Sequence, residues 1–447
     1  YYYDTAAMAR GLAPNESASL KATCERMFPD DKTMRKGDEL VNAKGIFDLP
    51  PNIEEQIAGY CIQDVDLTYA LYNKMQPIYP QSELDIIDLT CRMFVEPKLV
   101  VNKPLLIAHK EAVAEDTVQK IARSGLSREQ LASQKQFAEY LESIDITVPT
   151  KKSPRTGEMI PAFSKTDAAY TQMCNMYPQY KHIWNAREAV KSRIEETRAQ
   201  RLLEGCTIQN TLPVPLKYYA AHTGRFGGSE KINLQNLPRG SKLRNALQAG
   251  PGETLYVADL SNIEARMLAW LAREQDLLDS FASGEDVYSN FASQIYNRSI
   301  TKNDKLERYV GKTAILGLGY GMGANKYKAV LAQGSPAIDV TQSTALGIVS
   351  QYRAMYPNIP QLWAIGKQLL FYMLDQTSSS YSYGPLQVAS NALKLPNDMY
   401  LQYPKLRYSS GEFVYDSGRT GITRTHGPRL VENIIPVSYT HLTLPTT

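Results

Sequence analysis

Asp259 is the first residue whose type and position suit catalysis. It directly follows Thr254–Ala258, a short apolar run of β-forming residues, and a glycine at position 252 precedes that run. The pattern predicts a buried strand with Asp259 at its end. A carboxylate fixed at such a point can hold a metal ion. Strand-end aspartates without a catalytic role are also common, so this residue alone leaves both interpretations open.

A second group lies on one face of a predicted helix. Arg308, Lys312, Leu316 and Tyr320 recur every four residues, and they therefore form one gently winding stripe. Arginine suits bidentate phosphate contacts and lysine acts as a point charge. Two such cations one turn apart can grip a triphosphate while the aromatic ring meets a base. The stripe is equally compatible with a surface cation pair that leads into core positions.

Periodicity and turn residues place these groups on particular elements. A helical period from Asn262 to Phe281 predicts one helix after the strand. The pattern Thr301-x-x-Asp304 resembles a capping box, and it predicts the start of the helix that carries the stripe and ends near Tyr320. Three more segments are predicted in the same way: a helix at 50–75, an exposed basic loop at 148–167 and one amphipathic helix at 181–203.

The composition is that of an ordinary globular protein. Of the 447 residues, 43% are hydrophobic and 21% are charged, which excludes wholesale disorder and rod-like folds. No apolar run reaches the roughly 18 residues of a membrane-spanning helix, so no membrane partner is expected. Five widely spaced cysteines without a CxxC pair argue against a disulfide framework and a zinc site, and they suit a reducing compartment.

The charge is unevenly distributed along the chain, although the net value is only +3. Residues 1–85 carry eight basic and fourteen acidic side chains, whereas residues 150–250 carry sixteen basic and seven acidic ones. A basic tract of this size is a candidate surface for a polyanion. A solvated helix face would have the same composition, so charge alone leaves both interpretations open.

Several segments together resemble family A DNA polymerases, the group that contains bacterial DNA polymerase I and its phage relatives. Leu255–Arg266 resembles their motif A, and Arg308–Gly321 resembles their motif B. Thr223–Phe226 and Asn233–Pro238 are similar to segments that hold the primer–template. Thr425–Ile434 resembles the run that leads into the last helix of the palm. The order and spacing of these segments agree with the family, and their sequences are more similar to its phage branch.

The resemblance implies template-directed DNA synthesis, in which a nucleotidyl group passes from a dNTP to a primer 3′-hydroxyl with the help of two Mg²⁺ ions. Asp259 is then expected to bind the metal ions, and Glu264 is expected to close the pocket near the 2′ position of the sugar. Arg308 and Lys312 are expected to neutralise the triphosphate, with Lys312 also a candidate proton donor to pyrophosphate. Tyr320 is expected at the templating position.

The resemblance also implies contacts with DNA and a remnant of proofreading. The residues expected to touch the primer–template are Arg225, Asn233, Gln235 and Asn236. Lys151, Lys152 and Arg155 are further candidates for non-specific phosphate contacts. Tyr60 and Asp64, four residues apart on the helix at 50–75, resemble the third motif of a 3′–5′ exonuclease. In that motif the aspartate is a metal ligand and the tyrosine orients the attacking water.

The implied fold is of the α+β class, a right-hand polymerase preceded by a truncated RNase H-like exonuclease domain. The expected divisions are 1–85 for the exonuclease part, 86–210 for a helical thumb, 211–264 for the first part of the palm, 265–385 for the fingers, 386–435 for the incomplete second part of the palm, and 436–447 for a non-native tail. The expected location is the cytoplasm of a bacterium or of a phage-infected host. A processivity factor cannot be identified from the sequence.

Three departures from the family pattern bear on activity. Leu316 stands where motif B usually has an aromatic residue, and Leu260 stands where motif A usually has tyrosine. Motif C, a His-Asp-Glu turn with the second metal-binding carboxylate, does not occur, because His426 and His441 are followed by glycine and leucine. We therefore expect a fragment truncated at both ends and inactive as it stands.

Two alternatives remain beside this interpretation. One is a non-catalytic fragment that binds primer–template DNA, because the binding residues are retained while the catalytic pair is incomplete. The other is a single-subunit RNA polymerase, which shares the logic of motifs A and B. Glu264 disfavours the latter, because an RNA polymerase must leave room for a 2′-hydroxyl.

Overall fold

The computed structural model describes residues 1–153, 156–164, 167–334, 336–375, 381–418 and 421–440. The chain divides into two compact units. Unit 1 comprises residues 1–95, 216–228 and 258–447, and unit 2 comprises residues 96–215 and 229–257. Both helices and sheets are present, and the fold class is α+β as predicted. In the described part of the chain, no helix is both long and apolar enough to cross a membrane.

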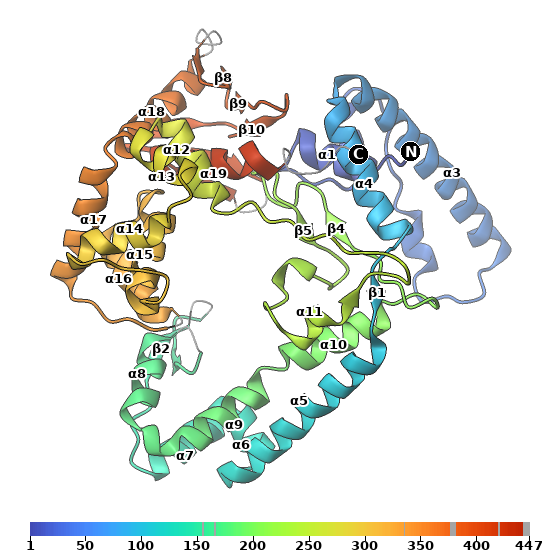
Figure 1. Cartoon of the computed structure of the whole chain (residues 1–447). Helices are drawn as coiled ribbons and strands as arrows, with labels where there is room; N and C mark the ends of the chain where they lie inside the picture. The colour runs from blue at the N-terminus through green and yellow to red at the C-terminus, as the bar shows by residue number, and fades with distance from the viewer. Residues whose placement is uncertain (154–155, 165–166, 335, 376–380, 419–420, 441–447) are drawn as a thin grey trace. The chain divides into compact units, whose positions relative to one another are not determined.

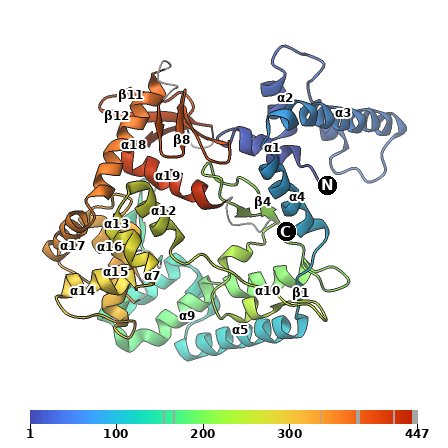
Figure 2. The same cartoon turned by 45° about the horizontal axis from the view of Figure 1, so that its top comes forward.

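The N-terminal part of unit 1 is helical. The predicted helix at 50–75 is confirmed as α3, which begins at Pro51, where proline is tolerated because the first turn needs no amide donor. Figure 2 shows α3 beside the two short helices that precede it. No strand occurs among residues 1–95, all of which are described. The elements are α1 (Thr5–Leu12), α2 (Leu20–Met27), η1 (Glu39–Ala43), α3 (Pro51–Met75), η2 (Gln76–Ile78) and α4 (Gln81–Val95).

The C-terminal part of unit 1 packs most of its helices around the largest hydrophobic core of the chain. The prediction of a single helix from Asn262 to Phe281 is wrong. The chain leaves the helical conformation at Arg273, whose φ is 55°, and two helices form instead of one. The buried carboxylate of Glu274 then accepts a hydrogen bond from the amide of Asn358 at 2.9 Å. The helices are α12 (Ile263–Ala272), α13 (Gln275–Ala282), α14 (Val287–Tyr296), α15 (Lys305–Leu318), α16 (Ala324–Gln333), α17 (Gln342–Met355), α18 (Asn358–Leu374) and α19 (Gly427–Thr440).

The described residues of unit 1 also form three small antiparallel sheets, and strands from each of them are labelled in Figure 1 or Figure 2. One is a four-stranded sheet in the order β10-β9-β8-β7, the second is the meander β11-β12-β13, and the third is the hairpin of β4 and β5. In the meander, Phe413 pairs with Thr425, which leads directly into α19. The strands are β4 (Leu216–Lys217), β5 (Gly227–Gly228), β7 (Ser382–Tyr383), β8 (Leu386–Ala389), β9 (Ala392–Lys394), β10 (Tyr400–Gln402), β11 (Arg407–Ser409), β12 (Glu412–Ser417) and β13 (Gly421–Thr425).

The buried strand predicted at Thr254–Ala258 does not form. The segment is irregular and exposed, with Tyr256 90% and Val257 74% accessible to solvent. The sequence prediction rested on β-propensity, which is realised only when a neighbouring strand completes the hydrogen-bond ladder and covers the side chains. No strand in the described part of the chain pairs with these residues. Asp259 therefore lies in an exposed, irregular segment and not at the end of a buried strand.

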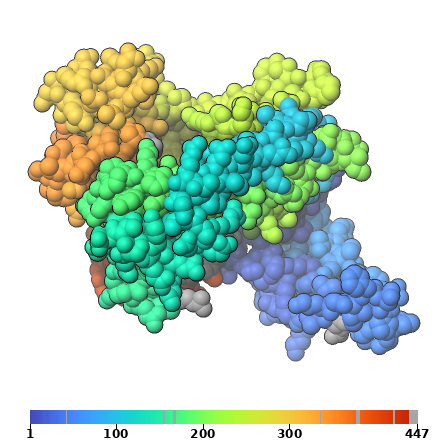
Figure 3. Space-filling model, turned by 90° about the horizontal axis from the view of Figure 1, so that it is seen from below, coloured from blue at the N-terminus to red at the C-terminus, as the bar shows by residue number. Residues whose placement is uncertain are grey.

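Unit 2 is mainly helical and has two small hydrophobic cores. Figure 3 shows the α5 segment as an open cyan ridge on its surface, in keeping with only two buried residues along that helix. The basic loop predicted at 148–167 contains a short hairpin, β2 paired with β3. The elements are β1 (Val100–Val101), α5 (Lys103–Ser124), α6 (Arg128–Ala132), α7 (Gln134–Ser143), β2 (Thr150–Lys152), β3 (Met159–Pro161), α8 (Ala168–Met176), η3 (Pro178–Tyr180), α9 (Lys181–Lys191), α10 (Ile194–Glu204), η4 (Leu234–Asn236), α11 (Lys242–Asn245) and β6 (Leu247–Gln248).

The single helix predicted at 181–203 is interrupted between α9 and α10. Ser192 leaves the helical region with φ −104° and ψ 81°. The two halves serve different cores, since Ile183 of α9 packs in one and Leu202 of α10 packs in the other. In a continuous helix, the direction of the apolar face of one half fixes the direction of the apolar face of the other half. The break lets each half turn its apolar face toward its own core.

Gly311 allows α14 and α15 to approach closely. A Cβ atom at this position would lie 2.2 Å from the carbonyl oxygen of Tyr288 and 3.0 Å from Cβ of Ala292. We expect Gly311→Ala to destabilise the protein by about 1–3 kcal/mol, because the backbone contact leaves no room for a methyl group. Urea unfolding measures the change.

The control is Gly347→Ala in the middle of α17, where an added Cβ meets nothing within 4 Å. That substitution should stabilise the protein by about 0.5–1 kcal/mol, because alanine loses less backbone entropy in a helix. Equal effects of the two substitutions would show that the crossing of α14 and α15 is not tightly packed.

Candidate active site

Three residues of the predicted stripe, Arg308, Lys312 and Leu316, lie on α15, and Tyr320 lies in the turn that follows the helix. The stripe combines the two interpretations given to it, a cation pair and a set of core positions. Lys312 is exposed, and it makes no ion pair or hydrogen bond with another described residue. Leu316 and Tyr320 are partly buried and pack against the core of unit 1. The C-terminal half of the stripe thus anchors the helix, while its N-terminal half presents positive charge to solvent.

Arg308 is held in place by a carboxylate that the sequence analysis did not identify. Its Nε lies 2.5 Å and its Nη2 lies 3.1 Å from the two carboxylate oxygens of Asp286, and its guanidinium lies 5.3 Å from the ring centroid of Tyr288. Ser289 donates a further hydrogen bond to Asp286 at 2.8 Å. Burial raises the pKa of the Asp286 carboxyl, but the hydrogen bonds from Arg308 and Ser289 outweigh burial and hold that pKa below its ordinary value.

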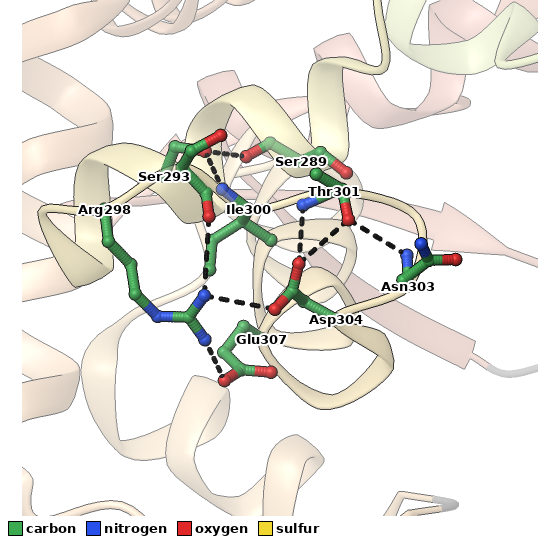
Figure 4. Close-up of polar contacts among 9 residues, drawn as sticks. Ser289, Ser293, Arg298, Ile300, Thr301, Asn303, Asp304 and Glu307 are labelled. Carbon is green, nitrogen blue, oxygen red and sulfur yellow. Dashed lines mark hydrogen bonds and ion pairs between the residues drawn. The ribbon is translucent and has the colours of Figure 1, made fainter.

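The loop before α15 is fixed by its own polar contacts, which Figure 4 shows. The amide and hydroxyl of Thr301 donate to the carboxylate of Asp304 at 2.8 and 2.9 Å. Arg298 forms ion pairs with Asp304 at 3.1 Å and with Glu307 at 2.5 Å. The helix begins at Lys305, so the predicted start at Thr301 was four residues too early. Asp304 uses its carboxylate to close the preceding turn, and Arg308 follows one turn into the helix.

Arg225 and Glu264 lie together in unit 1. They form an ion pair, in which the Arg225 side chain is 48% and the Glu264 side chain 35% exposed. Arg225 lies in the turn between β4 and β5, where its carbonyl accepts the amide of Ala220 at 3.0 Å. Glu264 lies in the first turn of α12, where a carboxylate is favoured by the helix dipole. Two residues assigned to different roles by their sequence motifs are therefore neighbours.

Tyr288 connects this ion pair to the phosphate-binding candidates. Its hydroxyl donates to the side-chain oxygen of Asn262 at 2.5 Å, while its ring lies beside Arg308. Asn262 has a left-handed backbone with φ 56°, and it starts the helix that carries Glu264. Asp286 and Tyr288 are the residues that sequence reasoning missed. Their only sequence signal is an acidic residue before a helix, which is too common to identify a site.

Asp259 does not belong to a formed metal centre. It lies in the exposed segment before α12. Within the described ranges of the chain, no three His, Cys, Asp or Glu side chains are grouped closely enough to hold a metal ion. One exposed carboxylate does not fit the demand of two Mg²⁺ ions, which prefer several oxygen ligands in near-octahedral geometry. The residues that are present therefore do not assemble the predicted two-ion site.

The other predicted DNA contacts lie in unit 2. Asn233 caps η4 through a hydrogen bond from the amide of Gln235 at 3.0 Å, and both Gln235 and Asn236 are exposed. Lys151 forms an ion pair with Asp167 at 2.9 Å, which lowers its net contribution of charge. Lys152 is exposed on β2, and Arg155 lies outside the described residues.

The exonuclease-like pair lies on α3 next to a lysine. Lys36 forms an ion pair with Asp64, and its ammonium lies 4.5 Å from the ring centroid of Tyr60. The ammonium thus neutralises the carboxylate that was predicted to bind metal. The metal-binding role of Asp64 and the orienting role of Tyr60 stay predictions.

Comparison with known proteins identifies the family. Residues 106–368 match DNA polymerase family A. The chain is 25% identical over 460 residues to the DNA polymerase of Bacillus phage SP02, an alignment that covers 88% of this chain and 66% of that protein. It is 25% identical over 319 residues to DNA polymerase I of Treponema pallidum, which covers 67% of this chain and 30% of that protein. The chain thus spans 66% or less of the length of these relatives.

A solved structure supports the same fold. The POL domain of Pol1 from M. smegmatis, in a complex with DNA primer-template and dNTP, aligns with a TM-score of 0.65 at 20% identity. The alignment covers 98% of this chain and 69% of that chain. At this level of identity the likeness concerns the fold alone.

The ion pair of Asp286 should make stability depend on pH. Because the folded-state pKa is lowered, the contribution of Asp286 is present above the unfolded pKa of about 3.9 and is lost as the pH falls through the folded value. We expect Asp286→Asn to lower the free energy of unfolding by about 1.5–3 kcal/mol at pH 7. The difference from the unmodified protein should shrink as the pH falls below about 4.

Urea unfolding at several pH values measures this difference. The control is Asp276→Asn, because Asp276 is exposed and makes no ion pair with another described residue. A difference that stays constant from pH 7 to pH 3 would contradict an ionised pair as its source.

Proposed function

Because the chain belongs to DNA polymerase family A, we propose that it takes part in template-directed DNA synthesis, in which a dNTP extends a primer 3′-hydroxyl. The observation that carries the proposal is the polar half of α15. It places the exposed Lys312 one turn after Arg308, and Arg308 is already fixed by Asp286. The chain spans only part of its relatives, and the activity of a whole polymerase is therefore part of the proposal.

Arg308 and Lys312 bind the triphosphate in this proposal. Asp286 engages Nε and Nη2 of Arg308, and Nη1 donates to no described residue. The guanidinium is thereby oriented before a nucleotide arrives, which reduces the entropy lost on binding. Lys312 supplies a point charge and holds a proton at Nζ for the departing pyrophosphate.

Glu264, Leu316 and Tyr320 surround the nucleoside in the same proposal. Glu264 excludes a 2′-hydroxyl, and Arg225 supports its position through their ion pair. Leu316 contacts the sugar with an aliphatic side chain, which gives weaker packing than an aromatic ring. Tyr320 occupies the templating position, and its packing against the core of unit 1 limits its freedom.

DNA binding involves Arg225, Asn233, Gln235 and Asn236, together with non-specific contacts from the basic tract at 150–250. Family A DNA polymerases are nucleotidyltransferases that generally use divalent metal ions. Asp259 is the proposed ligand in this chain, and it accounts for one carboxylate of a pair of Mg²⁺ ions. Among the described residues, no group of three or more His, Cys, Asp or Glu side chains could complete such a site.

The alternatives are supported to different degrees. A non-catalytic role in binding primer–template DNA is supported by the exposed cations and by the single carboxylate at Asp259. Primer extension with Mg²⁺ beside filter binding of the same DNA distinguishes binding from synthesis. A proofreading remnant at Tyr60 and Asp64 is supported less well, because Lys36 already neutralises the carboxylate. Membership of a DNA polymerase family disfavours a single-subunit RNA polymerase.

Lys312→Ala should weaken dNTP binding to the complex of this chain with primer–template DNA. We expect a loss of about tenfold, because a charge-assisted contact with phosphate contributes on the order of 1.5 kcal/mol. Equilibrium titration with a fluorescent dNTP measures the affinity. Lys305→Ala is the matched control, since Lys305 is an exposed lysine at the start of the same helix and is not part of the stripe. Equal losses of dNTP affinity in both variants would show that Lys312 contributes only general electrostatic attraction for the dNTP.

Glu264→Ala should reduce discrimination against ribonucleotides. Removal of the carboxylate opens space for a 2′-hydroxyl, so the ratio of dNTP to rNTP affinity should fall by about tenfold or more if the penalty is about 1.4 kcal/mol or more. The ratio is measured by competition titration on the same primer–template complex. Arg225→Ala provides a comparison that removes the ion pair but keeps the carboxylate. An unchanged ratio in Glu264→Ala would show that Glu264 is not a gate for the sugar.

A further inference from the structure

Unit 2 contains a cavity of about 700 Å³ that the proposed polymerase function does not use. Its volume lies within the range of sites for small organic ligands, roughly 300–1,000 Å³. The wall combines aromatic rings with cations. The residues that matter for its chemistry are Phe163, Tyr170, Trp184, Lys151, Arg187 and Lys191.

Arg187 is a buried cation that has no ion pair with a described residue. It is only 3% exposed, and its Nη1 donates to the carbonyl oxygens of Leu131 and Ser133, the latter at 3.1 Å. Its Nε is buried and has no hydrogen-bond partner among the described residues. Those residues also provide no carboxylate in an ion pair with it. The guanidinium also lies 4.4 Å from the ring centroid of Phe137 and 5.3 Å from that of Phe163, and these cation–π contacts offset part of the cost of burying the charge. An anion in the cavity would offset more of it, because burial of a charge is costly.

Lys191 adds a second cation on the same wall. It lies one turn after Arg187 on α9 and lines the same cavity. Partial burial and the neighbouring charge of Arg187 lower the pKa of Lys191. Glu188 also lines the cavity, and Lys151 is paired with Asp167. Along this part of α9, the wall carries the two cations of Arg187 and Lys191 and the one carboxylate of Glu188.

The aromatic side chains form the apolar part of the wall. Phe163 and Tyr170 are in edge contact, with ring centroids 5.7 Å apart. Trp184 is 8% exposed, and its Nε1 donates to the carbonyl oxygen of Tyr177 at 3.1 Å. Rings fixed in this way offer a surface on which a base can pack at little entropic cost. A ligand that fits this wall has a flat aromatic body and an anionic group.

We propose that this cavity binds a nucleotide, with its phosphate beside Arg187 and Lys191 and its base against Tyr170 and Trp184. A free nucleotide and the terminal nucleotide of a single DNA strand share this chemistry. Every lining residue belongs to unit 2, whereas Asp259 and Lys312 belong to unit 1. Binding in the cavity can therefore be tested independently of the proposed polymerase site.

The fluorescence of Trp184 reports directly on the cavity. The chain has three tryptophans, and the substitutions Trp270→Phe and Trp363→Phe leave Trp184 as the sole one. The probes are deoxyadenosine 5′-monophosphate and a single-stranded oligonucleotide of deoxyadenosine. We expect saturable quenching by at least one probe. Lys191→Glu should weaken the quenching affinity by about tenfold or more, which corresponds to about 1.4 kcal/mol.

Lys181→Glu is the matched control, because Lys181 is exposed at the other end of α9 and does not line the cavity. It should change the affinity by less than about twofold, since its charge is distant from the bound phosphate. Quenching by the monophosphate identifies a free nucleotide as sufficient, and quenching by the oligonucleotide alone identifies a strand end. Quenching should persist when Lys312→Ala is also present. A failure of the proposed polymerase site is therefore distinguishable from a failure of the proposed cavity site.

Three results would overturn the proposal. The first is the absence of quenching by both probes. The second is equal loss of affinity in Lys191→Glu and Lys181→Glu, which would indicate general electrostatic attraction. The third is equal affinity for deoxyadenosine, which lacks the phosphate and should bind more weakly if the cations recognise the anion.

Discussion

The bidentate contact of Arg308 with Asp286 is the interaction on which the geometry of the candidate site depends. It connects α15 to the start of α14, and it fixes the guanidinium that we propose binds phosphate. The contact is possible because Gly311, one turn further along α15, lets the two helices approach closely. Close packing and charge pairing thus act on the same helix pair. A change in either would move the cations relative to the rest of unit 1.

The same helix pair connects nucleotide binding to the gate proposed at Glu264. Tyr288 contacts Arg308 with its ring and Asn262 with its hydroxyl, and Asn262 begins the helix of Glu264. Glu264 in turn pairs with Arg225. The contacts of Tyr288 are partly buried, whereas the ion pair of Arg225 and Glu264 is exposed. Because they share residues or a helix, the energies of these contacts should not add independently. The residues proposed to contact the phosphate, the sugar and the primer therefore belong to one polar network.

The sequence predicted the elements whose signal is local and missed the features that depend on distant partners. The helix α3 follows from its own periodicity and was predicted with nearly correct bounds. The helix of the stripe was also predicted from its periodicity, but its start was placed four residues too early. The break between α9 and α10 was missed because the two halves face different cores, which a periodic pattern does not reveal. Asp286 lies 22 residues before Arg308, and only the packing of α14 on α15 brings the two together.

The strand predicted at Thr254–Ala258 also depends on a distant partner that a local sequence pattern does not reveal. It matters for the proposed site because Asp259 follows it. Its apolar side chains would be buried only if a neighbouring strand covered them, and the described residues provide none. Asp259 consequently follows a segment whose backbone forms no hydrogen bonds with a neighbouring strand. To order one residue of such a segment costs about 1–2 kcal/mol of conformational entropy, and five residues precede the carboxylate. A metal ion bound at Asp259 would have to supply that ordering energy itself. In the described residues, the proposed cations on α15 are therefore fixed by neighbouring side chains, whereas the proposed metal ligand Asp259 lies on a segment that pairs with no strand.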